Sequence, residues 1–224
     1  MFVFDAYGTL LDVDAAAREA ATEPGMEALK DYSTAVAKGW RERQIRYSWL
    51  CSMMGQYDDF WELTSRALDA TLEEHGLASE EKIRKRLLSR YCRLSAYEEV
   101  ATVLASLRTA GHKLAVLSNA SQDMLKTATE AAGIYQYFDA LLSVDTLQCY
   151  KPTQAVYGLV TKHFGCNPSD VSFFSSNNWD ISGAGAFGFK TIWVNRNGAG
   201  WDKLPYFPDK IVTTIAEGTK GYTQ

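Results

Sequence analysis

The second half of the chain alternates short apolar runs with helix-like segments. The apolar runs lie at residues 112–121, 138–145, 171–180 and 190–196. Helical patterns at about 153–165 and 179–187 separate the later runs. Strands that alternate with helices form a parallel sheet covered by helices on both faces. The pattern therefore predicts an α/β fold with a Rossmann-like parallel-sheet core.

A long helical segment interrupts this alternation near the start of the chain. The apolar run of residues 2–5 predicts the first strand, whereas residues 14 to about 92 carry apolar side chains mainly at helical spacing. A chain of 224 residues, 46% of them apolar, can form one core that carries an inserted unit. We expect an α/β core domain of residues 1–13 and 93–224, and a helical cap domain of residues 14–92.

The charge balance and the cysteine pattern argue against several classes of partner. The formal net charge of −4 gives no general attraction for nucleic acid or an anionic membrane. No apolar stretch approaches the roughly 20 residues that span a bilayer, and no signal-like segment opens the sequence. Four scattered cysteines without a CxxC pair favour reduced thiols and a cytoplasmic location. Three distant histidines lack metal-ligand spacing, so we expect no zinc site.

Polar side chains occur where four of the predicted strands end. In open parallel sheets, ligands bind beyond the carboxyl ends of the strands. The residues concerned are Asp5, Ser118, Asn119, Lys151, Ser175, Ser176, Asn177 and Asp180. We expect these side chains to converge on one functional site.

Asp5 is the first of these residues and a candidate nucleophile. A carboxylate can attack an electrophile to form an ester, which water then hydrolyses. An aspartate in this position is also typical of a turn or a helix N-cap. The sequence YGT that follows, together with the polar residues at the other strand ends, favours the nucleophile.

Four ordered motifs of the chain resemble those of the haloacid dehalogenase superfamily. They are FDAYGTLLD at 4–12, LSNA at 117–120, YKP at 150–152 and SSNNWD at 175–180. The segment WRERQIRYSWL at 40–50 is similar to the halide-binding helix of the L-2-haloacid dehalogenases, and the likeness runs nearly end to end. This resemblance implies hydrolytic dehalogenation of short L-2-haloacids to D-2-hydroxy acids, through a covalent ester on Asp5 and with inversion at C2.

Two positions near the nucleophile differ from the phosphatases of the same superfamily. Those enzymes carry an aspartate two residues after the nucleophile, where this chain has Tyr7. Ser175 and Ser176 stand where they usually supply a further aspartate. Magnesium requires several oxygen ligands in near-octahedral placement. We therefore expect no metal and no other cofactor, although Tyr7 could also be an aromatic residue that only packs in the core.

Arg41 is the arginine that the resemblance singles out in the cap. A guanidinium keeps its proton and is weakly hydrated, so it suits a desolvated halide ion. The alternative is a solvated arginine, like Arg43 and Arg46 on the same segment. The segment WRERQ favours the halide role for Arg41.

The roles expected for Ser118, Asn119 and Lys151 also come from the resemblance. Asn119 would donate to the departing halide, and the Ser118 hydroxyl to the substrate carboxylate. The Lys151 ammonium would keep the Asp5 carboxylate ionised. From the residues alone, Ser-Asn is equally typical of a turn, and a lone lysine is more typical of a solvated surface.

Thr9 and the last polar loop complete the expected catalytic set. Thr9 would hydrogen-bond the Asp5 carboxylate, and the residues of the loop would position the hydrolytic water and the ester carbonyl. Which residue is the general base stays open, and Asp180 is the one in that loop that can ionise. The whole catalytic set is Asp5, Thr9, Arg41, Asn119, Lys151, Ser175, Asn177 and Asp180.

Apolar side chains should complete the substrate pocket, with Ile45 and Phe60 from the cap and Trp179 from the core. Tyr157, one helical turn after the YKP motif, would support Lys151 or Asp5. Each of these aromatic residues is also typical of a packed core. The expected substrate-binding set is Ala6, Tyr7, Arg41, Ile45, Phe60, Ser118, Asn119, Tyr157 and Trp179.

The chain departs from the family pattern beside the site. Ala120 replaces the glycine that commonly follows Ser-Asn, and Asn178 stands where a small residue is usual. Both positions affect loop geometry and pocket size. Neither removes a chemical group that the reaction needs.

The expected partners are a small halogenated carboxylic acid, a halide ion, water and a second copy in a homodimer, with neither nucleic acid nor membrane. Two other functions fit parts of the pattern. One is a magnesium-dependent small-molecule phosphatase of the same superfamily, and the other is a non-catalytic binding protein that keeps the fold. The intact Asp5, Lys151 and Asp180 favour an enzyme over a binding protein.

Overall fold

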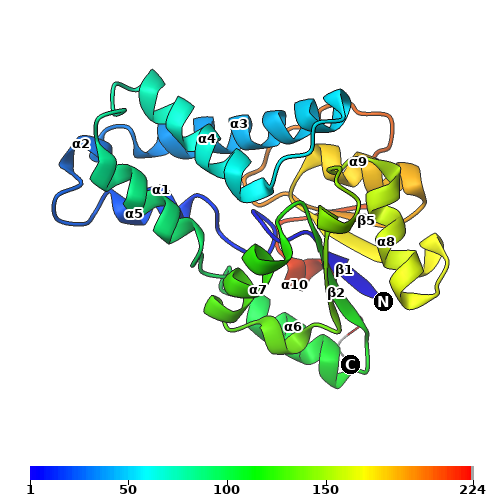
Figure 1. The fold of residues 1–224 in the computed structure, drawn as a ribbon. Helices are drawn as coiled ribbons and strands as arrows, with labels where there is room; N and C mark the ends of the chain where they lie inside the picture. Colours follow the sequence, from blue (N-terminus) through cyan, green and yellow to red (C-terminus); the bar gives the residue numbers. More distant parts are fainter. Residues whose placement is uncertain (223–224) are drawn as a thin grey trace.

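The computed structural model describes residues 1–222, and its centre is a parallel sheet (Figure 1). Within these residues the sheet has six strands in the order β3-β2-β1-β4-β5-β6, and every neighbouring pair is parallel. The strands are β1 (Phe2–Phe4), β2 (Leu114–Ser118), β3 (Ala140–Ser143), β4 (Ser172–Ser175), β5 (Lys190–Val194) and β6 (Lys210–Val212). This architecture confirms the predicted α/β fold.

β1 is short, yet it occupies the middle of the sheet. Its Val3 pairs in register with Ala115 of β2 and Phe173 of β4, and all of its residues are buried. A strand that is covered on both faces is apolar throughout, as the FVF sequence is. The backbone NH of Asp5 donates to the carbonyl of Phe174 at 2.8 Å. This bond extends the pairing beyond β1 and places Asp5 at the carboxyl edge of the sheet.

Helices cover both faces of the sheet. Figure 1 shows α6, α7 and α10 on one side of the strands and α8 and α9 on the other. Their bounds are α6 (Val100–Thr109), α7 (Gln122–Ala131), α8 (Gln154–Phe164), α9 (Asn178–Phe187) and α10 (Ile215–Gly218). Single 3-10 turns lie at η1 (Tyr135–Tyr137), η2 (Val144–Thr146) and η3 (Pro168–Asp170). The helical segments expected at 153–165 and 179–187 correspond to α8 and α9.

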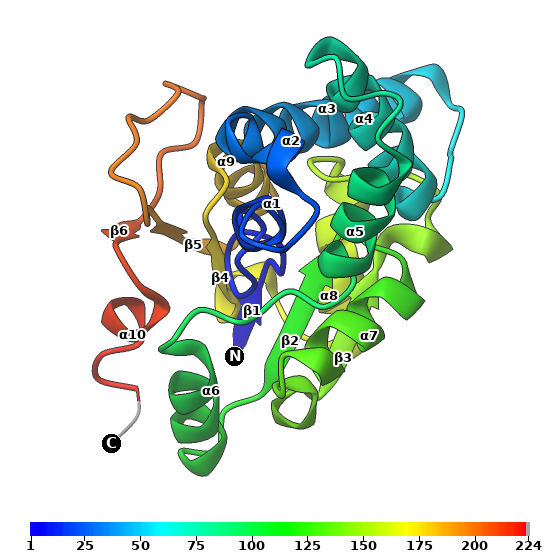
Figure 2. The ribbon, with the colours of Figure 1, turned by 90° about the vertical axis from the view of Figure 1, so that its left-hand side faces the viewer.

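A second group of helices lies between β1 and α6 in the chain. They are α1 (Ala15–Ala20), α2 (Glu27–Lys30), α3 (Ser33–Met54), α4 (Phe60–Glu74) and α5 (Glu81–Tyr91). Figures 1 and 2 show them together as a layer beyond the carboxyl ends of the strands. The helical structure expected over 14–92 is therefore present, while the division into cap and core domains at those bounds stays a prediction.

The two segments that connect this helical layer to the sheet run side by side. The NH of Asp12 donates to the carbonyl of Ser95 at 3.0 Å, and the NH of Tyr97 donates to the carbonyl of Leu10 at 3.0 Å. The departing and returning chain are thus paired next to the loop that carries Asp5.

The sheet differs from the sequence prediction in two respects. β6 was not predicted, because only two consecutive apolar residues, Ile211 and Val212, mark this short edge strand in the sequence. The strands are also shorter than the apolar runs; the run at 171–180 contains β4, but α9 already begins at Asn178. In the part of the chain that is described, no helix has the length and apolar character needed to cross a membrane.

Candidate active site

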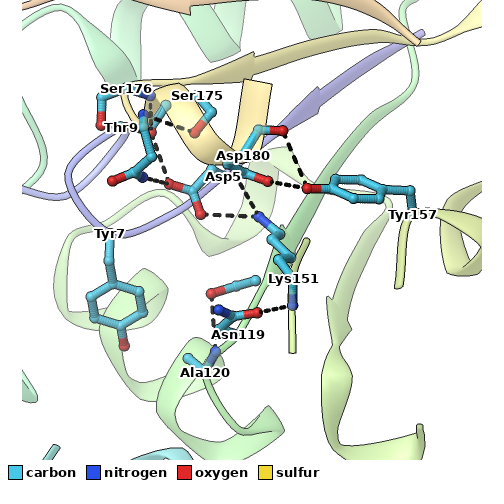
Figure 3. A network of polar contacts seen from close by, with 12 residues as sticks. Asp5, Tyr7, Thr9, Asn119, Ala120, Lys151, Tyr157, Ser175, Ser176 and Asp180 are labelled. Carbon is cyan, nitrogen blue, oxygen red and sulfur yellow. Dashed lines mark hydrogen bonds and ion pairs between the residues drawn. The ribbon is translucent and has the colours of Figure 1, made fainter. Parts of the chain in front are cut away.

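The carboxylate of Asp5 lies at the centre of a polar network at the carboxyl edge of the sheet (Figure 3). Its Oδ2 accepts hydrogen bonds from Thr9 Oγ1 at 2.9 Å and from Asn177 Nδ2 at 3.1 Å. Its Oδ1 accepts from Lys151 Nζ at 3.2 Å. Only 5% of Asp5 is exposed. Both carboxylate oxygens are therefore held in fixed directions inside the protein.

A tight turn after β1 brings Thr9 back to Asp5. Gly8 has a φ of +89°, a backbone conformation that L side chains rarely adopt, and a Cβ there would lie 3.2 Å from Ser176 Oγ. The Thr9 hydroxyl in turn accepts from the NH of Ser176 at 2.8 Å. The Thr9 hydroxyl thus hydrogen-bonds both the candidate nucleophile Asp5 and the loop after β4.

Lys151 links two buried carboxylates. Its Nζ lies 3.2 Å from Asp5 Oδ1 and 3.0 Å from Asp180 Oδ2, and its side chain is 1% exposed. Its backbone NH donates to Asn119 Oδ1 at 2.9 Å, which holds the loop after β3 against the end of β2. Buried charges are retained when they are paired and hydrogen-bonded, as these are.

Asp180 lies in the first turn of α9 and is fully buried. Its Oδ1 accepts from the Tyr157 hydroxyl at 2.9 Å. Burial raises the pKa of Asp180, while the Lys151 ammonium and the Tyr157 hydrogen bond oppose the shift. Burial also raises the pKa of Tyr157, so its phenol stays protonated and donates. Asp180 is a carboxyl group whose environment suits proton transfer.

The loop after β4 supplies one direct contact to Asp5. Asn177 donates to it, as described above, whereas the fully buried Ser175 hydroxyl accepts from the backbone NH of Asn177 at 3.2 Å. Ser175 therefore supports Asn177 in this structure. Its expected role in positioning water stays a prediction.

Asn119 presents a buried amide donor at the end of β2. Its Oδ1 is engaged by Lys151, but its Nδ2 is buried and has no hydrogen-bond partner among residues 1–222. Nearby, Ser118 Oγ accepts from the NH of Ala120 at 3.2 Å, and Ser143 Oγ donates to the Ala120 carbonyl at 2.8 Å. Ala120, which stands in place of the glycine, is fully buried, and its NH and carbonyl are both hydrogen-bonded. The free Nδ2 can donate to an anionic acceptor.

Arg41 reaches from α3 to the loop that carries Asp5. Its Nη2 donates to the carbonyl of Tyr7 at 3.1 Å, and its Nη1 donates to Gln44 Oε1 at 2.8 Å. The two neighbouring arginines point elsewhere, since Arg43 pairs with Glu74 and Arg46 lies over the Tyr47 ring. The structure thus separates Arg41 from the other basic residues of α3.

The expected pocket residues are divided between two environments. Trp179 joins Arg41 and Asn177 in the wall of a cavity of about 300 Å³, and its ring packs edge-on against Trp49. Ile45 is buried on α3, and Phe60 packs against Tyr150; in the described residues neither lines this cavity. The structure thus places Trp179 beside Arg41 and Asn177, and the expected pocket roles of Ile45 and Phe60 stay predictions.

Ala6 and Tyr7 are both buried beside Asp5, and the Tyr7 ring stacks on Tyr91 with centroids 5.4 Å apart. Burial raises the pKa of Tyr7, so its phenol is neutral. Among residues 1–222, no three His, Cys, Asp or Glu side chains gather in a way that could hold a metal ion. Gln44 and Tyr91 were not predicted as site residues. The one sequence signal for Gln44 is its position one helical turn after Arg41.

Comparison with known proteins gives a consistent set of matches. A family model for haloacid dehalogenase-like hydrolases matches residues 1–188. The chain is 44% identical over 196 residues to (S)-2-haloacid dehalogenase 4A of Burkholderia cepacia. The aligned region covers 88% of this chain and 83% of that protein.

Solved structures give the same picture. A dehalogenase with an intermediate complex aligns with a TM-score of 0.90 and 40% identity, over 97% of this chain and 94% of that one. L-2-haloacid dehalogenase from Xanthobacter autotrophicus with covalently bound chloropropionic acid aligns with a TM-score of 0.85 and 34% identity. The alignment covers 96% of this chain and 95% of that one.

Proposed function

The chain belongs to the haloacid dehalogenase-like hydrolases, and from this premise we propose that it hydrolyses short L-2-haloacids to D-2-hydroxy acids. Its relatives at up to 44% identity are named (S)-2-haloacid dehalogenases, and one similar structure carries chloropropionic acid in covalent linkage. The observation that carries the proposal is the buried Asp5 carboxylate, held by Lys151 at 3.2 Å beside a second carboxylate. Such an arrangement suits covalent catalysis.

In the first step an oxygen of Asp5 attacks C2 of the haloacid. A carbon–oxygen bond forms, the carbon–halogen bond breaks, and the halide departs with the bonding electrons and with inversion at C2. Arg41 and the free Nδ2 of Asn119 receive the developing anion. Because Thr9 and Asn177 both donate to Oδ2, we assign the attack to Oδ1.

In the second step water attacks the ester carbonyl of Asp5. Negative charge then develops on Oδ2, where the Thr9 and Asn177 donors lie at 2.9 and 3.1 Å, distances suited to an oxyanion. Asp180 accepts the proton of the water, and Tyr157 and Lys151 hold its carboxylate in place. The bond between the ester carbonyl carbon and the substrate oxygen then breaks, and Asp180 returns its proton to the departing oxygen, which releases the hydroxy acid and restores Asp5.

The same proposal includes substrate orientation. Ser118 and the amides of its loop would hold the substrate carboxylate. Ala6 and Tyr7, which are buried beside Asp5, and Trp179, which lies beside Asn177, would bound the space around C2. The cap of residues 14–92 would close over this space. Arg41 on α3 already reaches the Asp5 loop, which supports that arrangement.

We also propose a homodimer in the cytoplasm. The end of α3 supports the dimer, because Leu50, Met53 and Met54 expose 42%, 75% and 62% of their surfaces. The four free cysteines support a reducing compartment. Light scattering of the purified protein would test the dimer, and a monomer mass would contradict it.

The function is tested by halide release from the two enantiomers of 2-chloropropionate. We expect release from the S enantiomer alone, with D-lactate as product, because the halide and carboxylate sites fix two substituents relative to Asp5. Equal rates on both enantiomers would contradict the proposal. Phosphatase activity that requires magnesium would favour the phosphatase alternative, and binding without turnover would favour the non-catalytic one.

A further inference from the structure

Gln44 lies one turn after Arg41 on α3 and bonds directly to its guanidinium. Arg41 Nη1 donates to Gln44 Oε1 at 2.8 Å, and Gln44 is only 1% exposed. We propose that Gln44 is a positioning residue that aims the Arg41 guanidinium at the leaving halide. This inference rests on the proposed function, in which Arg41 receives that halide.

The surroundings fix which way the Gln44 amide points. The Thr64 hydroxyl donates its hydrogen to the carbonyl of Phe60 at 2.6 Å, so it accepts from Gln44 Nε2, which lies 2.7 Å away. The amide oxygen therefore faces Arg41. A flipped amide would place its NH₂ donors against the donors of the guanidinium. Hydrogen-bond donation thus runs in one direction from Arg41 through Gln44 and Thr64 to the carbonyl of Phe60.

Tyr91 ties the same amide to the loop after β1. Its hydroxyl accepts from Gln44 Nε2 at 2.9 Å, and its ring stacks on Tyr7 with an interplanar angle of 8°. Tyr7 in turn supplies the carbonyl that accepts from Arg41 Nη2 at 3.1 Å. The two acceptors of Arg41 are therefore joined through Tyr91, and they hold both arms of the guanidinium fork.

This arrangement bears on catalysis because arginine is a long and flexible side chain. Fixing it in one rotamer costs conformational entropy. Because Gln44 holds Arg41 in the folded protein, this entropy is lost when the protein folds and not during the reaction. The guanidinium is therefore already oriented when charge develops on the halide. Gln44 itself does not touch the substrate in this account; it acts through Arg41.

The test compares Gln44→Leu with Ser48→Ala. Ser48 is a matched control because it is fully buried one turn further along α3 and donates to the carbonyl of Ile45 at 2.7 Å, away from Arg41. We expect Gln44→Leu to lower kcat/KM by about tenfold to a hundredfold, a loss that a misplacement of about 1 Å can cause. The loss should be larger for 2-chloropropionate than for 2-bromopropionate, since chloride is the poorer leaving group. Ser48→Ala should show no such dependence on the halogen.

A second pair of variants separates positioning from folding. In an Arg41→Lys background, Gln44→Leu should cause no further loss of kcat/KM, because its target is gone. Equal losses in Gln44→Leu and Ser48→Ala, or a full additional loss in the Arg41→Lys background, would overturn the inference. If Gln44→Leu fails to fold, Tyr91→Phe keeps the ring stack but removes the hydroxyl. It should then give a smaller loss with the same halogen dependence.

A measurement that needs no turnover keeps this inference distinct from the proposed function. If the wild-type protein releases no halide from either substrate, the proposed function fails. Nitrogen NMR of the Arg41 side chain, assigned through Arg41→Lys, still tests the positioning. We expect two resolved Nη signals in the wild type and one averaged signal in Gln44→Leu. Averaged signals in both proteins would contradict the role of Gln44.

Discussion

Lys151 places its ammonium 3.2 Å from the Asp5 carboxylate, and the two side chains expose only 1% and 8% of their surfaces. The same ammonium lies 3.0 Å from Asp180. Two carboxylates, one proposed as nucleophile and the other as base, therefore share one buried cation. Removing this cation should lower the free energy of unfolding more than removing an exposed lysine does.

Lys151→Met should destabilise the protein in a way that depends on pH. Removing one member of a buried ion pair costs about 3–5 kcal/mol, and we expect a loss of that size in the free energy of unfolding near pH 7. Burial raises the pKa of Asp180 and Lys151 opposes the shift, so the variant raises this pKa further. A group with a raised pKa in the folded state loses its stabilising contribution as the pH rises through that pKa. The difference in unfolding free energy between the variant and the wild type should therefore become smaller as the pH falls.

Urea unfolding of Lys151→Met at pH 5 and pH 7 checks this expectation. Lys162→Met is the matched control, because Lys162 is exposed on α8. A deficit that is the same at both pH values, or no larger than that of the control, would argue against a shared buried cation.

Arg41→Ala should reduce halide release far more than Arg43→Ala or Arg46→Ala. Removing a preorganised donor to a developing anion typically costs about a hundredfold to a thousandfold in rate. Arg41 alone of the three bonds to the Tyr7 loop, whereas Arg43 pairs with Glu74 and Arg46 lies over Tyr47. Steady-state kinetics of the three variants would decide. Similar losses in all three would point to damage of α3 instead of loss of a halide site.

Tyr157→Phe should move the acidic limb of the pH–rate profile to higher pH. The Tyr157 hydroxyl donates to Asp180 and thereby lowers the pKa of that carboxyl group. Without this bond the pKa rises, and the base is protonated at a pH where the wild-type base is ionised. The profile of kcat against pH measures the effect. An unchanged acidic limb would mean that Asp180 is not the group that limits activity in acid.

The strand ends are the part of this site that sequence alone makes predictable. Asp5, Lys151 and Asp180 belong to different strand–helix units, and a parallel sheet brings the carboxyl ends of its strands to one edge. The short polar segment after each apolar run marks where that edge lies. The family resemblance then supplied roles for these residues and singled out Arg41, which helical periodicity could not do.

The partners of these residues were harder to predict. Gln44 meets Thr64 and Tyr91 across 20 and 47 positions of sequence, and a glutamine on a charged helix is usually solvated. Only tertiary packing shows that its amide is buried. The hydrogen bond that the Ser175 hydroxyl accepts from the NH of Asn177 was likewise not predictable from its position in the motif. β6 escaped prediction since only two consecutive apolar residues mark this edge strand of three residues.

Halide release should continue in the presence of a chelator. The family resemblance places Tyr7 at one aspartate position of the related phosphatases and Ser175-Ser176 at another, so magnesium would lack two of its expected carboxylate ligands. Initial rates on (S)-2-chloropropionate, measured with a chelator and then with added magnesium, provide the check. Activity that disappears with the chelator and returns with magnesium would contradict metal-independent catalysis.

The oxygen that enters the product tests the account most directly. If Asp5 attacks C2, the new carbon–oxygen bond uses an enzyme oxygen, and water attacks the ester afterwards. Direct attack on C2 by water activated at Asp180 would form no ester. The two routes therefore place the oxygen of the solvent in different molecules.

A single turnover in heavy-oxygen water, with enzyme in excess over (S)-2-chloropropionate, separates the routes. We predict unlabelled D-lactate and heavy oxygen in the peptide that contains Asp5, both measured by mass spectrometry. A peptide from the Asp180 region serves as the internal control and should stay unlabelled. Heavy oxygen in the first-turnover lactate, with an unchanged Asp5 peptide, would contradict the nucleophilic mechanism.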